Sequence, residues 1–265
     1  MNKFLYYVKR AYNTFNQMEM RILPGNVAFF FVLALIPIIT IIMVIASYFS
    51  ISVDTIIHFI RTFIPEEASN IVVEAISGKG FDSSVGAFNV IALFVASNGT
   101  YAIVNASNTL YQVNNSDPLK DRIKSIILLL VLLLLIVFLL LVPMFGEKIL
   151  SLFSEFGFIK ELKLLYNIFK WPLTIFFMYS NLKLIYTIAP SKQVASSSTT
   201  YGAIFTTVIW TVATAIFSYY LKYFANFILI YGNLSSIIIL MMWLYIISYV
   251  FVMGIAINVT NLNEN

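Results

Sequence analysis

The sequence predicts an all-α integral membrane protein, built as a bundle of six transmembrane helices. Hydrophobic residues make up 60% of the 265 residues and charged residues only 11%, whereas soluble domains carry about 25% charged residues. Six apolar stretches reach the roughly 20 residues that a helix needs to cross a bilayer. None shows the two-residue alternation of transmembrane barrel strands. This composition argues against a soluble enzyme, a disordered chain and a secreted disulfide scaffold.

The six predicted spans follow one another with polar connections between them. We expect Pro37 to kink the first span, because proline removes a helical hydrogen bond, and Pro190 follows the end of the fourth. Together the spans form a membrane domain over 22–260, with a short tail at 261–265. The spans cover residues 26–49, 85–111, 125–145, 168–189, 201–221 and 233–259.

Two segments outside the spans have helical patterns. Residues 1–21 form a basic, aromatic arm, which predicts an N-terminal helix lying in the membrane interface or, as an alternative, packed on the base of the bundle. The long acidic connection 51–84 predicts an amphipathic helix that is broken at Pro65 and a second short helix from Glu66 to Ile76.

Lysine and arginine set the expected orientation. Nine of the 16 lie on the side of the termini. Four precede the first span and two lie in the connection that follows it. Positive residues are retained in the cytoplasm, and the first span usually dominates. We therefore expect a multi-pass membrane protein with both termini in the cytoplasm.

Several kinds of chemistry are disfavoured by the residues that the chain lacks. It has no cysteine and one histidine, His58, so we expect no disulfide, no metal site and no cofactor. None of the six predicted spans contains Asp, Glu or His, and proton relays in membranes normally use those residues. There is also no basic stripe for nucleic acid.

Two polar stripes are the candidate cavity-lining residues. Asn98, Asn105 and Asn108 share one side of the second span, which ends at Tyr111. The fifth span carries Thr207, Thr211 and Thr214 at helical spacing. The stripes predict either a hydrated wall that contacts substrate, or hydrogen bonds between helices and to the helices' own carbonyl groups.

The order of several motifs resembles the YihY/BrkB family of bacterial inner-membrane proteins, over about residues 15–260. The motifs include Ser97-Asn98-Gly99 with the following asparagines, and a last third that contains Tyr201-Gly202-Ala203, Tyr231-Gly232 and Gly254 to Asn258. The resemblance implies Tyr111 and Asn258 as further cavity residues. The structural positions that it implies are Pro37, Pro190, Trp210, Gly232, Trp243 and Gly254.

The resemblance implies six spans and a role in transport or lipid handling, but no agreed activity. An older label of the family, ribonuclease BN, looks mistaken, and this sequence shows neither an acidic metal cluster nor a catalytic histidine pair. Two positions depart from the family. Ala256 stands where members usually have a glutamate, which puts cation or proton coupling in doubt, and Asn26 stands where they tend to have alanine.

Three functions remain open at this point. The first is a transporter or a lipid- or amphiphile-handling protein without an intramembrane carboxylate. The second is a non-transporting envelope scaffold that binds protein partners through the acidic connection and the basic arm. The third is a membrane enzyme, which would need Asp117, Asp121 and Glu147 to converge. We expect membrane lipids as partners, leave self-association open and expect no nucleic acid.

Overall fold

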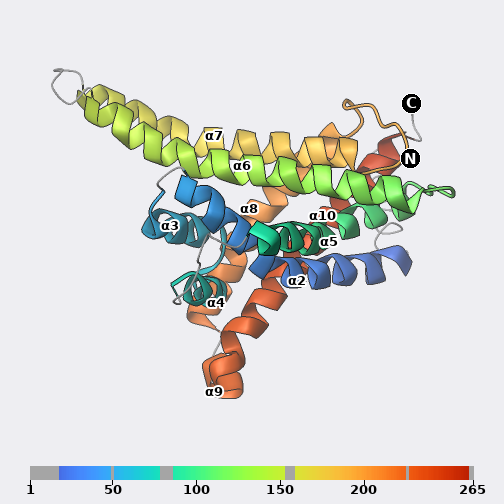
Figure 1. Cartoon of the computed structure of the whole chain (residues 1–265), viewed down its shortest axis with the longest axis horizontal. Helices are drawn as coiled ribbons and strands as arrows, with labels where there is room; N and C mark the ends of the chain where they lie inside the picture. Colours follow the sequence, from blue (N-terminus) through green and yellow to red (C-terminus); the bar gives the residue numbers. More distant parts are fainter. Residues whose placement is uncertain (1–17, 49–50, 78–85, 153–158, 225–226, 263–265) are drawn as a thin grey trace, which may run out of the picture.

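The computed structural model describes residues 18–48, 51–77, 86–152, 159–224 and 227–262 (Figure 1). Within these ranges the chain forms helices and connections without any strand, so the predicted all-α class is confirmed. The helices are α2 (Met18–Tyr48), α3 (Val53–Phe63), α4 (Glu66–Ser77), α5 (Gly86–Leu110), α6 (Pro118–Leu152), α7 (Ile159–Ile188), α8 (Thr200–Tyr223), α9 (Phe227–Tyr231), the 3-10 turn η1 (Gly232–Leu234) and α10 (Ser235–Leu262).

Each of the six predicted spans overlaps one long helix, namely α2, α5, α6, α7, α8 or α10, and the number of membrane spans stays a prediction. Among the described residues, three helical segments are both long and apolar enough to cross a membrane, namely Met18–Leu35, Thr200–Tyr223 and Ser235–Thr260. Most of the long helices extend past their apolar stretch, and α6 begins seven residues before residue 125. Hydropathy marks the part of a helix that suits lipid, whereas the helix itself continues into polar residues.

The six long helices pack in a closed ring. Each contacts its two neighbours in the order α2, α5, α6, α7, α8, α10 and back to α2, and α10 also reaches across to α5. Figure 1 shows that α2 begins, α5 ends, α6 begins, α7 ends and α10 ends toward the same side. We call this side, where α8 also begins, the polar end of the bundle, and the opposite side the apolar end.

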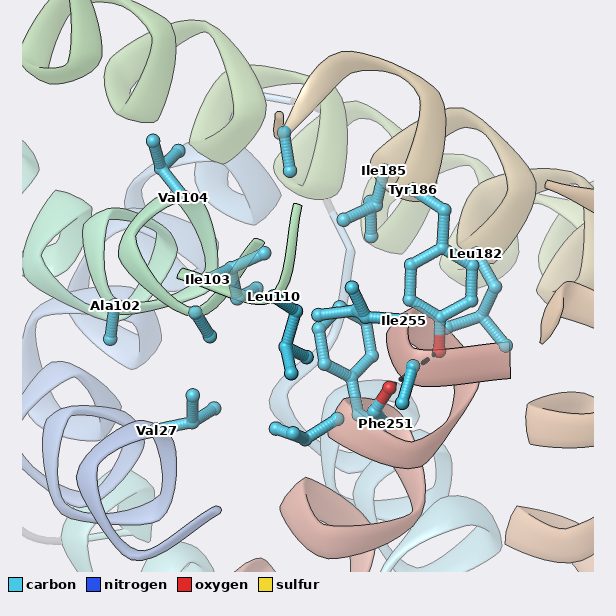
Figure 2. Close-up of a cluster of buried hydrophobic side chains, with 14 of the residues drawn as sticks. Val27, Ala102, Ile103, Val104, Leu110, Leu182, Ile185, Tyr186, Phe251 and Ile255 are labelled. Atoms are coloured by element: carbon cyan, nitrogen blue, oxygen red, sulfur yellow. Dashed lines mark hydrogen bonds between the residues drawn. The ribbon is translucent and has the colours of Figure 1, made fainter. Parts of the chain in front are cut away.

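The hydrophobic core has a different composition at each end. At the polar end it centres on Tyr186, Phe251 and Ile255, with side chains from α2 and α5 packed around them (Figure 2). At the apolar end it consists of residues such as Phe217 and Trp243. The core at the polar end contains buried phenol groups and backbone carbonyls that need hydrogen-bond partners. The candidate site therefore lies at this end.

The connection between α2 and α5 contains the two predicted short helices. Ser52 caps α3, because its hydroxyl accepts a hydrogen bond from the backbone N–H of Thr55 at 3.3 Å. Pro65 separates α3 from α4, and α4 packs on α10. The predicted arm, in contrast, falls outside the described residues over 1–17, and α2 begins at Met18, eight residues before the predicted first span.

Large apolar side chains cover the outside of the ring. Leu134 is 70% exposed and Ile216 63% exposed, and Phe29 and Phe176 are also exposed. Soluble monomers rarely expose contiguous apolar surface on this scale, and such surfaces mark contact with a membrane or a partner. The outer face of the long helices therefore suits lipid.

Candidate polar site

Three side chains from distant parts of the chain meet at the polar end. The amide nitrogen Nδ2 of Asn108 donates to Oδ2 of Asp121 at 2.9 Å, and the backbone N–H of Ser191 donates to Oδ1 of Asn108 at 2.7 Å. The hydroxyl of Ser191 donates to Oδ1 of Asp121. We call Asn108, Asp121 and Ser191 the polar triad. It ties the end of α5 to the first turn of α6 and to the connection between α7 and α8.

Asp121 is the buried acid of this triad. It precedes the predicted third span, but it already belongs to the first turn of α6 and is 2% exposed. A carboxylate near a helix N-terminus is stabilised by the helix dipole, and a buried one also needs hydrogen-bond donors. Asn108 and Ser191 are those donors. The sequence could not show this, because Ser191 lies 70 residues away along the chain.

Lys124 lies beside the triad, one turn further along α6. Its ammonium group donates to the carbonyl of Pro190 at 2.7 Å and to the hydroxyl of Ser191 at 3.2 Å. Burial lowers the pKa of Lys124, and the carboxylate of Asp121 offsets part of that shift. An open cleft of about 670 Å³ begins at this lysine and runs along the α7–α8 connection past Lys192.

Arg122 directly follows Asp121 on α6, and its side chain contacts α5. Its guanidinium donates to Oδ1 of Asn98 at 2.8 Å and to the carbonyl of Phe94 at 2.9 Å. It also stacks over the Phe94 ring, 3.9 Å from the centroid. Sequence reasoning used Arg122 only as an orientation signal and missed this contact. The asparagine stripe of α5 therefore faces α6, where Arg122 and Asp121 bind two of its three members.

Five further polar side chains are buried among the helices of the ring, and we call this set the inner polar cluster: Ser107, Tyr111, Tyr186, Thr206 and Asn258. The hydroxyl of Tyr186 bonds that of Thr206 at 2.7 Å. It donates to the carbonyl of Phe251 at 2.9 Å (Figure 2). Tyr111 belongs to the same buried core as Tyr186. Sequence reasoning named Tyr111 and Asn258 but missed Tyr186, because one tyrosine inside an apolar span gives no sequence signal.

Three buried atoms of this cluster have no hydrogen-bond partner among the described residues. They are the hydroxyl oxygens of Ser107 and Tyr111 and the amide nitrogen of Asn258. Ser107 lies one turn before Tyr111, which directly follows the end of α5 and whose backbone N–H donates to the Ser107 carbonyl at 2.9 Å. Leaving a buried polar group unpaired costs about 1–3 kcal/mol. The inner polar cluster therefore has spare capacity to bind water or a polar ligand.

Two glycines allow the helices around this cluster to approach closely. A Cβ atom at Gly254 would meet the hydroxyls of Thr206 and Tyr186, with the Tyr186 Cζ at 2.9 Å. A Cβ atom at Gly202 would meet the carbonyl of Gly254 and the amide of Asn258. The backbone N–H of Gly202 donates to Oδ1 of Asn258 at 2.8 Å. Glycine at 202 and 254 thus allows α7, α8 and α10 to meet.

The threonine stripe of α8 does not meet the asparagine stripe. Thr207 donates to the carbonyl of Ala203 at 2.8 Å and Thr211 to that of Thr207 at 2.9 Å, both within their own helix. Thr211 is exposed and Thr214 half-buried. α8 packs on α7 and α10, whereas the asparagine face of α5 packs on α6. Asn105 is half-buried.

The positions that the family resemblance implies as structural differ in their hydrogen bonds and backbone geometry. The indole N–H of Trp210 donates to the carbonyl of Ile247 at 2.7 Å, whereas that of Trp243 is buried without a partner in the described chain. Gly232 adopts a φ of 53°, which favours glycine. α2 continues as a helix through Pro37, and the expected kink stays a prediction.

The three acids required by the enzyme hypothesis do not come together. Asp117 is exposed and pairs with Lys120 at 3.7 Å, whereas Asp121 is buried in the triad. Glu147 lies 26 residues further along the same helix as Asp121, which is about 39 Å at 1.5 Å per residue. Within the described ranges, no three His, Cys, Asp or Glu side chains are grouped as metal ligands.

Comparison with known proteins identifies the family. The family model described as Virulence factor BrkB matches residues 11–265. A Bacillus subtilis protein, YfkH, whose name describes it as ribonuclease-like, is 31% identical over 261 residues, which cover 95% of this chain and 94% of that protein.

Shorter matches agree with this assignment. A UPF0761 membrane protein of Haemophilus influenzae is 32% identical over 71 residues, 27% of this chain and 26% of that protein. One from Coxiella burnetii is 37% identical over 67 residues, 25% of this chain and 24% of that protein. No solved structure matches. The family model and the full-length relative agree with the resemblance seen in the motifs, and the chain belongs to the Virulence factor BrkB family of membrane proteins.

Proposed function

We propose that this protein is a six-span protein of the bacterial cytoplasmic membrane that moves or handles a lipid, an amphiphile or a small solute. The closed ring of six long helices and its apolar outer face support the six spans. Even α8, with 24 residues, would extend about 36 Å at 1.5 Å per residue. That exceeds the roughly 30 Å of a hydrocarbon core.

The charge distribution supports an orientation with the polar end in the cytoplasm. In the predicted topology, nine of the 16 lysines and arginines lie on the side of the termini and seven on the other side. Six of these nine belong to the described polar end, namely Arg21, Lys120, Arg122, Lys124, Lys183 and Lys192. Positively charged residues near span ends are retained on the cytoplasmic side. The two ends of the described chain, Met18 and Leu262, would both lie on that side.

The observation that carries the proposal is the unpaired polar atoms of the inner polar cluster. An unpaired hydroxyl or amide is more costly in a membrane protein, because lipid supplies no hydrogen bond. Ser107, Tyr111 and Asn258 provide three such atoms among the helices of the ring. Water or the polar part of a transported molecule would satisfy them. A protein that only filled the membrane would not need this capacity.

The arrangement favours a facilitator over a proton-coupled pump. The one buried acid in the described chain, Asp121, precedes the predicted third span and accepts two hydrogen bonds from Asn108 and Ser191. A proton carrier in a transport path would instead alternate between two environments. Ala256 occupies the last-span position where the family usually has a glutamate, and it is buried.

Single cysteines test whether the inner polar cluster is wet, since the natural chain has none. Ser107→Cys exchanges a hydroxyl for a thiol of similar shape. We expect a membrane-impermeant maleimide to label it in inverted membranes and not in intact cells. Asn105→Cys tests the asparagine stripe in the same way. Ser116→Cys, in an exposed turn, is the positive control, and Thr211→Cys, on the exposed face of α8, is the lipid-facing control.

The proposal fails if Ser107→Cys stays unlabelled from both sides while Ser116→Cys reacts.

A measurement of flux provides the second test. Proteoliposomes that contain the wild-type chain should scramble fluorescent lipids, or release small solutes, faster than empty liposomes. Tyr111→Phe removes one unpaired hydroxyl and should change that rate, whereas Tyr223→Phe, on the exposed end of α8, should not. Equal rates with and without protein would argue against transport.

The alternative function is an envelope scaffold, and one feature favours it. α3 and α4 place Asp54, Glu66 and Glu74 on an exposed acidic surface at the apolar end. Cross-linking from Glu74→Cys in intact cells would test this function. Repeated recovery of one partner protein, lost when Asp54 and Glu66 are also neutralised, would favour the scaffold. Recovery of lipid and self-contacts alone would argue against it.

A further inference from the structure

The cleft beside the polar triad is lined by two lysines and, among its lining residues, no acid. Lys124 closes one side, and Ser191, Lys192 and Gln193 line the α7–α8 connection. Lys192 is exposed, and no ion pair or hydrogen bond of its side chain occurs within the described residues. The two lysines therefore give the cleft a positive potential, which the carboxylate of Asp121 beside Lys124 offsets only in part.

Lys124 is a cation whose charge is poorly matched by its neighbours. Its ammonium has three donors, and its two hydrogen-bond partners, the Pro190 carbonyl and the Ser191 hydroxyl, are neutral. The nearby acid, Asp121, is occupied by Asn108 and Ser191, and the described residues contain no ion pair between it and Lys124 within 4.0 Å. An anion that enters the cleft would stabilise the charged form of this half-buried ammonium, because an opposite charge nearby favours that form.

The cleft also lies where the apolar part of the bundle begins. Tyr201 and Ile204 in the first turns of α8 are exposed, and so is Leu184 in the last turns of α7. These side chains suit lipid tails, whereas the lysines suit the charged headgroup level of a membrane. A molecule with a charged head and an apolar tail would match both surfaces.

We propose that this cleft binds a phosphate group, carried by a phospholipid headgroup or by a free phosphate compound. Phosphate has several acceptor oxygens and a full negative charge, and lysine is a common partner for it as a point charge. Lys124, Lys192 and the amide of Gln193 are the donors. This assignment gives the ligand class for the proposed function and rests on it for the cytoplasmic position of the cleft.

Binding can be measured without any transport assay. The full chain, purified in a phosphate-free maltoside detergent, is titrated with phosphatidylglycerol and with phosphatidylcholine, and bound lipid is counted by native mass spectrometry. We expect preferential binding of phosphatidylglycerol. Lys192→Glu should weaken it by about tenfold or more, because a charge-assisted bond becomes a repulsion. Lys192→Gln should weaken it by several-fold, and Lys124→Gln should add to that effect.

Lys120→Gln is the matched control. Lys120 lies on the same helix end but pairs with Asp117 and does not line the cleft, so its loss should leave binding within about twofold. Lys192 is exposed, and its variants should fold even if Lys124→Gln does not. The proposal is overturned if wild-type protein binds no phosphatidylglycerol, if Lys192→Glu binds as well as wild type, or if Lys120→Gln is equally weakened.

Competition distinguishes the two sources of the phosphate. Displacement of phosphatidylglycerol by sn-glycerol 3-phosphate or inorganic phosphate supports a free phosphate compound as the ligand, and no displacement supports the lipid headgroup. The flux result is separable. Lysine-dependent binding without flux keeps the phosphate site and rejects transport. Flux that persists in Lys192→Glu, together with unchanged lipid binding, rejects the site and keeps transport.

Discussion

The two ends of the helix ring are held together by different forces. At the apolar end, Phe217, Ile239 and Trp243 pack against α3 and α4, and the contacts are almost entirely hydrophobic. At the polar end, the helices are joined by the polar triad, by the Tyr186 hydroxyl and by the close approach at Gly202 and Gly254. Hydrophobic packing tolerates changes of shape better than directional contacts do. The polar end should therefore be the more sensitive to small substitutions.

The largest expected effect is a single methyl group at the polar end. Gly254→Ala places a Cβ atom against Tyr186 and Thr206, and overpacking of this kind costs about 3 kcal/mol. The thermal midpoint of purified protein in detergent should fall clearly. Gly25→Ala is the control, because its nearest neighbour, Tyr245 Cε2, would be 4.0 Å away. Similar midpoints for the two variants would mean that the glycine contact does not hold the helices.

The next effect concerns the buried carboxylate. Asp121→Asn keeps the shape of the side chain but replaces one of its two acceptor oxygens with a donor, so it can no longer accept from both Asn108 and Ser191, which should destabilise the protein by about 2 kcal/mol. Asp117→Asn removes only an exposed ion pair with Lys120 and should change stability by about 0.5 kcal/mol or less. Chemical denaturation of both variants measures the difference. Equal losses would show that the triad contributes no more than a surface pair.

Two tryptophans give a smaller contrast. Trp210→Phe loses the hydrogen bond to the Ile247 carbonyl and should cost about 1 kcal/mol. Trp243→Phe removes an indole N–H that has no partner in the described residues, so relief of that unpaired group should offset the lost packing. We expect the thermal midpoint of Trp243→Phe to lie nearer the wild-type value. The reverse order would contradict the assigned hydrogen bonds.

The smallest effect is a pH dependence of ligand binding. Only the protonated form of Lys124 attracts phosphate, and burial lowers its pKa from 10.5. In a Lys192→Gln background, phosphatidylglycerol affinity should therefore decline as pH rises through this lowered pKa, below the range of an ordinary lysine. The double variant with Lys124→Gln should lack that decline. Parallel titration curves for the two proteins would exclude Lys124 as the titrating group.

Much of the helical architecture could be predicted from the sequence, because it depends on local properties. Apolar runs of sufficient length identified the six long helices, and Pro65 correctly divided the connection into α3 and α4. The helix ends were less accurate, as α6 shows. Its apolar stretch begins near Ser125, but its first turn contains Asp121. A method based on hydropathy assigns such a residue to a loop.

The candidate site could be predicted only in part. The asparagines of α5 were correctly singled out as residues that need polar surroundings, and Asn98 and Asn108 have them in Arg122, Asp121 and Ser191. Their partners were not identified, because charged residues in short connections are equally well explained as orientation signals. The role of the stripes in binding a substrate stays a prediction.

The sequence by itself determined the all-α class of the protein and the approximate positions of the long helices in the described chain, because composition and hydropathy are sums over neighbouring residues. Only the tertiary structure decided which groups meet. Asn108 and Ser191 are 83 positions apart, and Tyr186 meets Phe251 across 65. Such pairs form when the ring closes, and the same closure leaves Ser107, Tyr111 and Asn258 with unpaired polar atoms and opens the cleft at Lys124.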